Sequence, residues 1–424
     1  MLRHTLSLSV FKCVYFNPKG EKMIRYIIAM FTLLTVMVSN AYAIPAFARQ
    51  MGVSCSACHS ENGYPTLNRF GRDFKASGYT MLGSEKTVGG SNQSSDGLAS
   101  IPSALNMSVV GGSSINSGSG SNGTTVATNN FGIFLGGRIS ENVGAFVEVG
   151  YTQGTAVTDT NQSDHFSLAN FVVPITYKIG DNTFGLVPYT TDGHSATASE
   201  FFDNGGFSAI SKVGARDKYG AKGLSLYIYN PNYFINYVAW SNGNRSGSEV
   251  KLANYFRAAY TPQIGNWDLE FGTQYMTGNT NNADANGFII PNSLKKTDAY
   301  VLDFNALGAV ANLPLDVAIS YARAKYDANS LFTTNSDGQD GKAFVFDTKL
   351  GIIPRTLIAR LYYVSQDHVD LNSNPNDKVN TTELGLKYFI AENVNVETTY
   401  DFISGNSVSA NNDNVYGLNF EVAF

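Results

Sequence analysis

The C-terminal three quarters of the chain repeats one pattern, in which segments of about ten residues alternate between apolar and polar side chains. Alternation with a period of two residues places the apolar side chains on one face of a β-strand. One such segment carries Trp267, Leu269, Phe271, Thr273 and Tyr275 on one face, with Asp268, Glu270, Gly272 and Gln274 on the other. The pattern recurs at 394–402 and 416–424, and no helical periodicity interrupts it between 104 and 424.

The lengths of the connections distinguish a transmembrane β-barrel from a soluble β-sandwich, which also alternates. Seven short connections lie around residues 141–142, 181–182, 231–232, 264–265, 312–313, 353–354 and 392–393. Eight long ones lie near 113–124, 153–165, 191–216, 242–250, 278–294, 327–341, 366–378 and 405–413. Short periplasmic turns and long outer loops are typical of bacterial outer-membrane barrels. We therefore predict an all-β fold, a barrel of about 16 antiparallel strands over residues 104–424, with both ends periplasmic and its outer face against outer-membrane lipid.

Three further expectations follow from the barrel. Proline cannot donate to a strand ladder, so Pro174 predicts a bulge or break in the fourth strand. An interfacial aromatic girdle is expected near the strand ends, at Tyr177, Tyr189, Tyr233, Tyr260 and Tyr388. The lumen-facing charged set is Glu148, Arg257, Asp268, Glu270, Asp347, Lys349, Arg360, Lys387 and Glu397. Mutual ion pairing accounts for this set, and Arg257, Lys349, Arg360 and Lys387 are alternatively candidates to bind acidic groups of a cofactor.

Residues 1–43 have the three parts of a secretory signal peptide, with a true start possible at Met23. Arg25 precedes a 13-residue apolar run, Tyr26–Val38, and an A-x-A site ends at Ala43. Thirteen apolar residues are too few for a membrane anchor, which needs roughly 17–25. Removing 1–43 takes away five basic residues and one acidic residue, leaving 24 Lys+Arg, 33 Asp+Glu and a net charge of −9. That balance argues against nucleic acid as a partner and is compatible with attracting cations.

The short run Cys55-Ser56-Ala57-Cys58-His59 reads Cys-x-x-Cys-His, the attachment signature of a c-type haem. Two thiols add to the porphyrin vinyl groups, and the adjacent imidazole ligates the iron. The alternatives are a Cys55–Cys58 disulfide and a chance match. The remaining cysteine, Cys13, lies in the predicted signal region, so the mature chain has two thiols and both belong to the motif. We therefore predict one covalent haem c.

The motif lies in a small segment, residues 44–83, which we predict to be an α-helical c-type haem domain. Pro45 suits the first turn of a helix leading towards Cys55. Tyr64-Pro65 is expected to open a second helix, which Gly78 would end. A segment of about forty residues cannot bury a porphyrin alone. We expect it to plug the barrel lumen, joined by a flexible Gly/Ser/Asn-rich linker at 84–103.

Four runs in this segment resemble the fused cytochrome–porins of iron-oxidising bacteria. They are residues 44–50, the motif itself, Tyr64–Gly71 and Phe74–Met81. The close match covers about forty residues, and over the barrel the resemblance is architectural. It implies a bacterial outer-membrane protein that oxidises extracellular Fe(II) at one haem and passes the electron to a periplasmic carrier. It also implies Cys55 and Cys58 as attachment residues and His59 as proximal iron ligand.

The sixth iron ligand has several candidates in the mature chain. They are Met51, Met81, Met107, His165, His194 and His368, with water as a further alternative. Met81 is favoured, because the chain can fold over the distal haem face after the second helix and Met/His ligation raises the potential. Candidate Fe(II) sites are Asp367-His368-Val369-Asp370 and Asp159 with Asp164 and His165. A solvated acidic loop is the favoured interpretation of either group.

Two rival functions stay open. One is a diffusion porin whose haem segment is structural or sensory. The other is an outward conduit that reduces external acceptors, since the direction of electron flow depends on reduction potentials rather than on sequence.

Overall fold

The structure is a computed structural model of the chain. It describes residues 45–83, 87–88, 101–102, 106–118, 124–152, 165–191, 209–214, 220–243, 250–284, 288–326, 329–332, 340–368, 378–405 and 414–424. The predicted signal peptide, 1–43, lies outside the described residues. Of the predicted linker, 84–103, only two pairs of residues are described, and they form a short antiparallel ladder between β3 (Thr87–Val88) and β4 (Ile101–Pro102).

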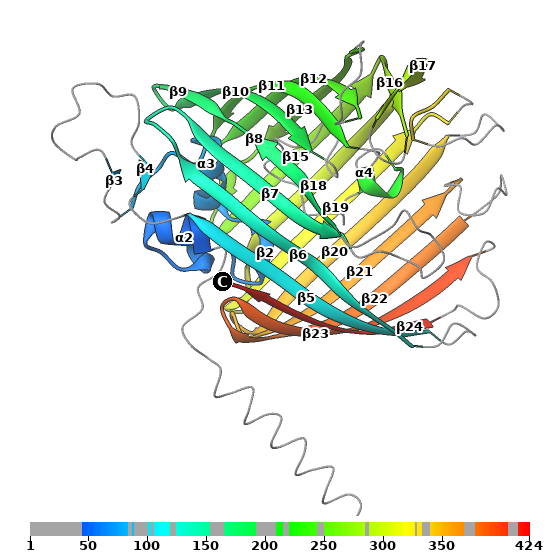
Figure 1. The fold of residues 1–424 in the computed structure, drawn as a ribbon. Coiled ribbons are helices and arrows are strands. Elements are labelled where there is room, and N and C mark those ends of the chain that lie inside the picture. The colour runs from blue at the N-terminus through cyan, green and yellow to red at the C-terminus, as the bar shows by residue number, and fades with distance from the viewer. Residues whose placement is uncertain are drawn as a thin grey trace, which may run out of the picture. The chain divides into compact units, whose positions relative to one another are not determined.

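Most of the described chain forms one closed antiparallel barrel (Figure 1). Its strands are β5 (Met107–Gly118), β6 (Thr124–Arg138), β7 (Gly144–Thr152), β8 (His165–Val172), β9 (Ile175–Ile179), β10 (Asn182–Thr191), β11 (Ala221–Asn230), β12 (Tyr233–Asn242), β13 (Ala253–Tyr260), β14 (Gln263–Ile264), β15 (Trp267–Thr277), β18 (Ala299–Val310), β19 (Leu313–Ala324), β20 (Gly341–Ile353), β21 (Leu357–Asp367), β22 (Lys378–Ala391), β23 (Val394–Gly405) and β24 (Asn414–Ala423). The ring closes where β24 pairs with β5, from Val415 opposite Gly118 to Ala423 opposite Val110.

These 18 segments make 16 spanning strands among the described residues, because two strands are each broken in two. Strands β8 and β9 both pair with β10, and β13 and β14 both pair with β15. A proline stands in each gap, Pro174 in the first and Pro262 in the second. The predicted break at Pro174 and the predicted strand number are both confirmed.

The alternation of short turns and long connections is also confirmed, with two differences in detail. Strand β5 runs on to Gly118, so only the end of the predicted 113–124 loop lies outside strands. The 278–294 connection contains a hairpin of β16 (Asn279–Ala283) and β17 (Ile289–Lys296). A β-hairpin inside a loop has the same local sequence pattern as loop residues of high β-propensity. The sequence therefore did not distinguish the two.

The two faces of each strand differ as alternation requires. On β15, Phe271 and Tyr275 are about half exposed on the outside, at 50% and 49%, whereas Glu270 and Gln274 are buried inside, at 2% and 8%. In the predicted girdle, Tyr177, Tyr260 and Tyr388 are at least half exposed. Tyr189 is a correction, because its side chain is buried inside the barrel. A tyrosine near a strand end can point to either face of the barrel wall, and the register of this strand points the Tyr189 side chain inward.

The inward charges form ion pairs with one another. Arg257 binds Glu270 and reaches both carboxylate oxygens of Asp303, at 2.6 and 2.8 Å. Arg360 lies 2.8 Å from Asp347 and 3.1 Å from Glu383, and Lys387 lies 3.1 Å from Glu397. The interpretation of this set as mutual ion pairs is confirmed for these three cations.

Part of the barrel interior is apolar rather than polar. A short helix in the long connection after β10, α4 (Ala209–Lys212), packs against β19 and β20. Ala209 and Ile210 are buried, and the Ala209 amide donates to the Ser320 hydroxyl at 2.9 Å. Inward side chains such as Val238 and Trp240 belong to the same apolar cluster. The interior is therefore narrower than the strand number alone implies.

The N-terminal segment contains α2 (Pro45–Met51), the 3-10 turn η1 (Cys55–Ala57), β1 (His59–Ser60), β2 (Gly63–Leu67) and α3 (Arg69–Ala76). Helix α2 begins at Pro45 as predicted. The second helix begins at Arg69 and not at Tyr64-Pro65, because β1 and β2 pair as a hairpin and Asn68 caps the helix by accepting from the Gly71 amide. Gly78 follows its end with φ +70°. Among the described residues, no helix is long and apolar enough to cross a bilayer.

We expect Arg257→Ala to destabilise the barrel by about 3–5 kcal/mol, because Glu270 and Asp303 would keep their charges with their common cation gone. Urea unfolding of the purified protein in detergent measures this change. Lys325→Ala is the control, since Lys325 is 70% exposed and lies 3.8 Å from Asp298; we expect a loss below about 1 kcal/mol. Equal losses in the two variants would contradict the ion-pair account.

Candidate functional site

The two cysteines and the histidine of the motif lie together on one tight turn. Cys55 begins η1, and the Cys58 amide donates to the Cys55 carbonyl at 3.0 Å. Both cysteines are half-buried, and no disulfide joins them. Burial raises the pKa of the Cys58 thiol. The turn thus presents two thiols from one short stretch of backbone.

His59 follows the turn as the first residue of β1. Burial lowers the pKa of its imidazole to about 4, against hydrogen bonds to the Pro65 and Thr66 carbonyls that favour the charged ring. The imidazole is therefore neutral at ordinary pH, and neutral imidazole is the form that binds metals. Two thiols and an adjacent neutral imidazole make the donor set that covalent haem attachment requires.

Helix α3 packs directly on this turn. A Cβ atom placed on Gly71 would overlap the carbonyl oxygen of Cys58, and the Asn68 amide donates to the same carbonyl at 3.0 Å. Glycine at 71 therefore allows the first turn of the helix to touch the backbone of the motif.

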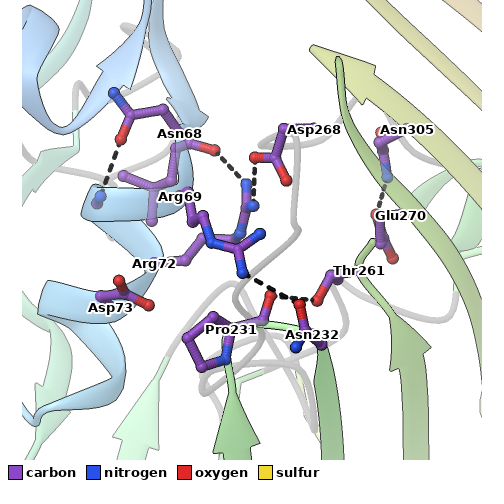
Figure 2. Close-up of polar contacts among 12 residues, drawn as sticks. Asn68, Arg69, Arg72, Asp73, Pro231, Asn232, Thr261, Asp268, Glu270 and Asn305 are labelled. Carbon is purple, nitrogen blue, oxygen red and sulfur yellow. Dashed lines mark hydrogen bonds and ion pairs between the residues drawn. The ribbon is translucent and has the colours of Figure 1, made fainter. Parts of the chain in front are cut away.

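On one side the segment is held to the barrel by polar contacts. Arg72 forms an ion pair with Asp268 of β15, and Arg69 donates to Asn232 in the turn after β11, as Figure 2 shows. The Ser60 hydroxyl donates to Asp316 of β19 at 2.6 Å, and Asn62 donates to the Lys349 carbonyl of β20 at 3.1 Å.

A second set of contacts reaches strands β6, β9 and β11. Tyr227 and Tyr229 of β11 donate to the Ala76 carbonyl and to Asp73, each at 2.7 Å. Thr176 of β9 donates to the Ser77 carbonyl at 2.9 Å, and Arg138 of β6 donates to the Thr80 carbonyl at 2.9 Å. Most of these barrel residues stand within a few positions of a short turn. The segment therefore lies at the short-turn end of the barrel, where Figure 1 draws α2 and α3.

An aromatic cluster completes this attachment. Phe47 of α2 stacks on Tyr79 at 4.7 Å between ring centroids and meets Phe74 of α3 edge-on at 5.3 Å. Phe146 of β7 lies 6.1 Å from Phe47 and 6.3 Å from Tyr79. The cluster joins both helices to the barrel wall through apolar contact.

Met81 is distant from α2 in sequence but lies beside the C-terminal end of that helix in the fold. Gln50 donates to the Met81 carbonyl at 2.7 Å and to the Tyr79 carbonyl at 2.6 Å. Gly83 approaches the Met51 carbonyl so closely that a side chain at 83 would overlap it. The structure therefore brings together the segments around Met81 and Met51, both of them candidates for the sixth iron ligand.

Of the four cations considered for an acidic cofactor group, Lys349 is the one in contact with the segment. Its ammonium donates to the Thr66 hydroxyl at 3.4 Å, and Thr66 is one of the two residues whose carbonyls bind His59. Arg257, Arg360 and Lys387 are engaged with carboxylates of the barrel wall.

Most of the candidate iron site residues lie outside the described chain. These are His194, Asp159, Asp164, Val369 and Asp370, and nothing is described of the His165 side chain. His368, which follows β21, has φ +53°. Within the described ranges, no group of three or more His, Cys, Asp and Glu side chains could hold a metal ion.

Sequence reasoning missed the residues that position the motif: Ser60, Asn62, Asn68, Gly71 and Arg72. A signal was present for one of them, because Asn ahead of a helix is a preferred N-cap. Ser60, Asn62 and Arg72 act on strands that are more than 100 residues away in sequence, and Gly71 contacts the Cys58 carbonyl, so their roles depend on the tertiary fold.

Comparisons with known proteins give similarities to solved barrels. No family model and no curated protein matches the sequence. OmpF of Salmonella typhi, in complex with daunomycin, is 13% identical with a TM-score of 0.49, covering 78% of this chain and 99% of that one. The outer-membrane channel DcaP of Acinetobacter baumannii is 14% identical with a TM-score of 0.46, covering 76% and 97%. OmpT of Vibrio cholerae is 11% identical with a TM-score of 0.45, covering 79% and 100%.

The features of the barrel itself establish its location in the cell. Its backbone polar groups are paired around a closed ring, and its outer face is apolar with exposed aromatic residues. A closed barrel with such a face is the strand architecture that spans a bilayer, and in bacteria it belongs to the outer membrane. The chain is a transmembrane β-barrel of the bacterial outer membrane.

We expect Gly71→Ala to loosen the N-terminal segment, because either α3 or the motif's backbone must move to admit the methyl group. The expected cost is about 1–3 kcal/mol. Limited proteolysis of the folded barrel measures it as faster cleavage within residues 45–83. Gly150→Ala is the control, since a Cβ there meets Ala169 at an ordinary 3.5 Å. Equal cleavage rates in both variants would show that the close approach is unimportant.

Proposed function

We propose that this barrel is an outer-membrane electron-transfer protein that oxidises extracellular Fe(II) at one covalent haem c and passes the electron to a periplasmic carrier. The observation that carries the proposal is the motif turn, with two cysteines that share no disulfide and an adjacent neutral imidazole, fixed at the short-turn end of a membrane barrel. A segment of this size has too small a core to enclose a cofactor alone, and the barrel wall supplies the missing cover.

The proposal gives each motif residue a role. Cys55 and Cys58 would hold the haem through thioether bonds, and His59 and Met81 would bind its iron. When bound, the haem supplies a one-electron redox centre: each Fe(II) that reaches it leaves as Fe(III), and the electron goes on to the carrier. Thr66, through its carbonyl, orients the His59 ring, and Lys349 holds the Thr66 hydroxyl.

The two ends of the barrel suit the two partners. Short turns face the periplasm in outer-membrane barrels, so the motif stands where a soluble periplasmic carrier can approach it. Fe(II) is taken to arrive from the long-loop side, through the barrel interior. The excess of acidic residues in the chain, 34 Asp+Glu against 29 Lys+Arg, favours the approach of cations.

A diffusion porin is the second candidate, and the barrel fold favours it. The contacts of the N-terminal segment with β6, β9, β11, β15, β19 and β20 count against free solute passage at that end. An outward conduit would use the same residues with the electron moving in the opposite direction.

We expect Fe(II) to reduce the oxidised protein directly, and the rate to fall as ionic strength rises, because salt screens the attraction between the acidic chain and Fe²⁺. Stopped-flow mixing of the detergent-solubilised protein with Fe(II) measures both. Cys55→Ala with Cys58→Ala is the control and should lose covalent haem and the reaction together. A haem that stays oxidised in excess Fe(II), yet accepts electrons from a periplasmic donor, would replace this proposal with the outward conduit.

We expect Met81→Ala to lower the haem reduction potential and change the low-spin spectrum, because a thioether ligand stabilises the reduced iron. Met51→Ala is the matched control, since Met51 lies in the same neighbourhood and should leave both unchanged. Redox titration followed by absorbance measures the two variants. If only Met51→Ala moves the potential, the ligand assignment passes to Met51.

A further inference from the structure

Asn68 lies between the motif turn and helix α3, and both the oxygen and the nitrogen of its side-chain amide form hydrogen bonds. The Oδ1 atom accepts a hydrogen bond from the Gly71 amide at 3.0 Å, which makes Asn68 the N-cap of α3. The Nδ2 atom points the other way, into the backbone of the motif. A capping role needs the oxygen alone, so the amide nitrogen has a separate use.

The amide nitrogen binds three carbonyls of the motif. It lies 3.3 Å from the Ser56 oxygen, 3.0 Å from the Ala57 oxygen and 2.9 Å from the His59 oxygen. Two N–H groups are therefore shared among three acceptors. The Asn68 backbone amide adds a fourth contact, to the Cys58 carbonyl at 3.0 Å. Of the five motif residues, four thus have their carbonyls held by Asn68.

The helix that carries Asn68 is itself fixed to the barrel. Arg69 donates to Asn232 at 3.1 Å, and Arg72 pairs with Asp268 (Figure 2). Asp73 accepts from the Tyr229 hydroxyl at 2.7 Å. These contacts come from two separate parts of the barrel wall. Asn68 therefore connects the motif turn to a helix that cannot easily move.

We propose that Asn68 is the positioning residue of the haem-attachment turn. By binding the carbonyls of Ser56, Ala57 and His59, its carboxamide holds the turn in the conformation that directs both thiols and the imidazole to one cofactor. This inference rests on the proposed haem function. It goes beyond that function by assigning to a residue outside the Cys-x-x-Cys-His motif the task of shaping it.

The test separates the two ends of the side chain. Asn68→Asp and Asn68→Ser both keep an oxygen that can cap α3, and both remove the carboxamide nitrogen. Asn68→Ala removes both functions. Asn282→Ser is the matched control, since the Asn282 amide binds only within the β16–β17 hairpin, to Ser293 at 3.1 Å. Each full-length variant is exported in cells that attach haem c, purified, and assayed for covalent haem per chain by intact mass and by pyridine haemochrome absorbance.

We expect the ratio of haem-attached to haem-free chains to fall by about fivefold or more in both cap-retaining variants, the factor that corresponds to one lost hydrogen bond. The haem that does attach should show more than one low-spin species, because the His59 carbonyl is no longer held. Heat-modifiable migration on gels checks that the barrels are folded.

Two results would overturn the proposal. Parental haem content and spectrum in Asn68→Asp and Asn68→Ser, with a defect only in Asn68→Ala, would reduce Asn68 to a helix cap. Parental behaviour in all three would deny it either role. A parent protein that carries no covalent haem would instead refute the proposed function, so the two failures are distinguishable.

Discussion

Pairing between the last strand and the first is the constraint on which the rest of this structure depends. Inside a bilayer every backbone amide and carbonyl must be satisfied by the protein itself, and a sheet achieves this only by closing on itself. The β24–β5 ladder runs over nine residue pairs, from Val415 opposite Gly118 to Ala423 opposite Val110. Closure also fixes which face of every strand points inward, because side chains alternate with a period of two. The positions of the interior charges follow from that register.

The interior charges then have to be paired, and the barrel does this in two ways. Along the wall, cations such as Arg257 and Arg360 bind carboxylates on neighbouring strands. At the short-turn end, wall carboxylates bind the N-terminal segment instead: Asp268 binds Arg72, and Asp316 accepts from Ser60. A buried carboxylate left without such a partner costs several kcal/mol. The segment is therefore part of the barrel's electrostatic balance as well as its occupant.

The sequence predicted the features that depend on local pattern. Alternation located the strands, turn lengths gave their number, and proline chemistry located the break at Pro174. The features it missed depend on distant partners. The second helix begins at Arg69 because a hairpin formed by β1 and β2 occupies the residues before it. Tyr189 lies inside the barrel because of its register with β11, where it faces Gly223. The apolar part of the interior depends on where α4 packs, which strand periodicity does not encode.

The same division applies to the candidate site. Cys55, Cys58 and His59 could be recognised because covalent attachment and metal ligation demand those residue types at that spacing. Asn68, Gly71 and Arg72 are ordinary residues whose value comes from what they touch. Gly71 matters because the Cys58 carbonyl lies against it, and Arg72 because it is buried and forms an ion pair with Asp268. Chemistry-bearing residues can thus be identified from one sequence. The residues that hold them in place can be identified only when the fold brings their partners near. In a small segment that a large barrel covers, the positioning residues decide whether the chemistry-bearing residues can function.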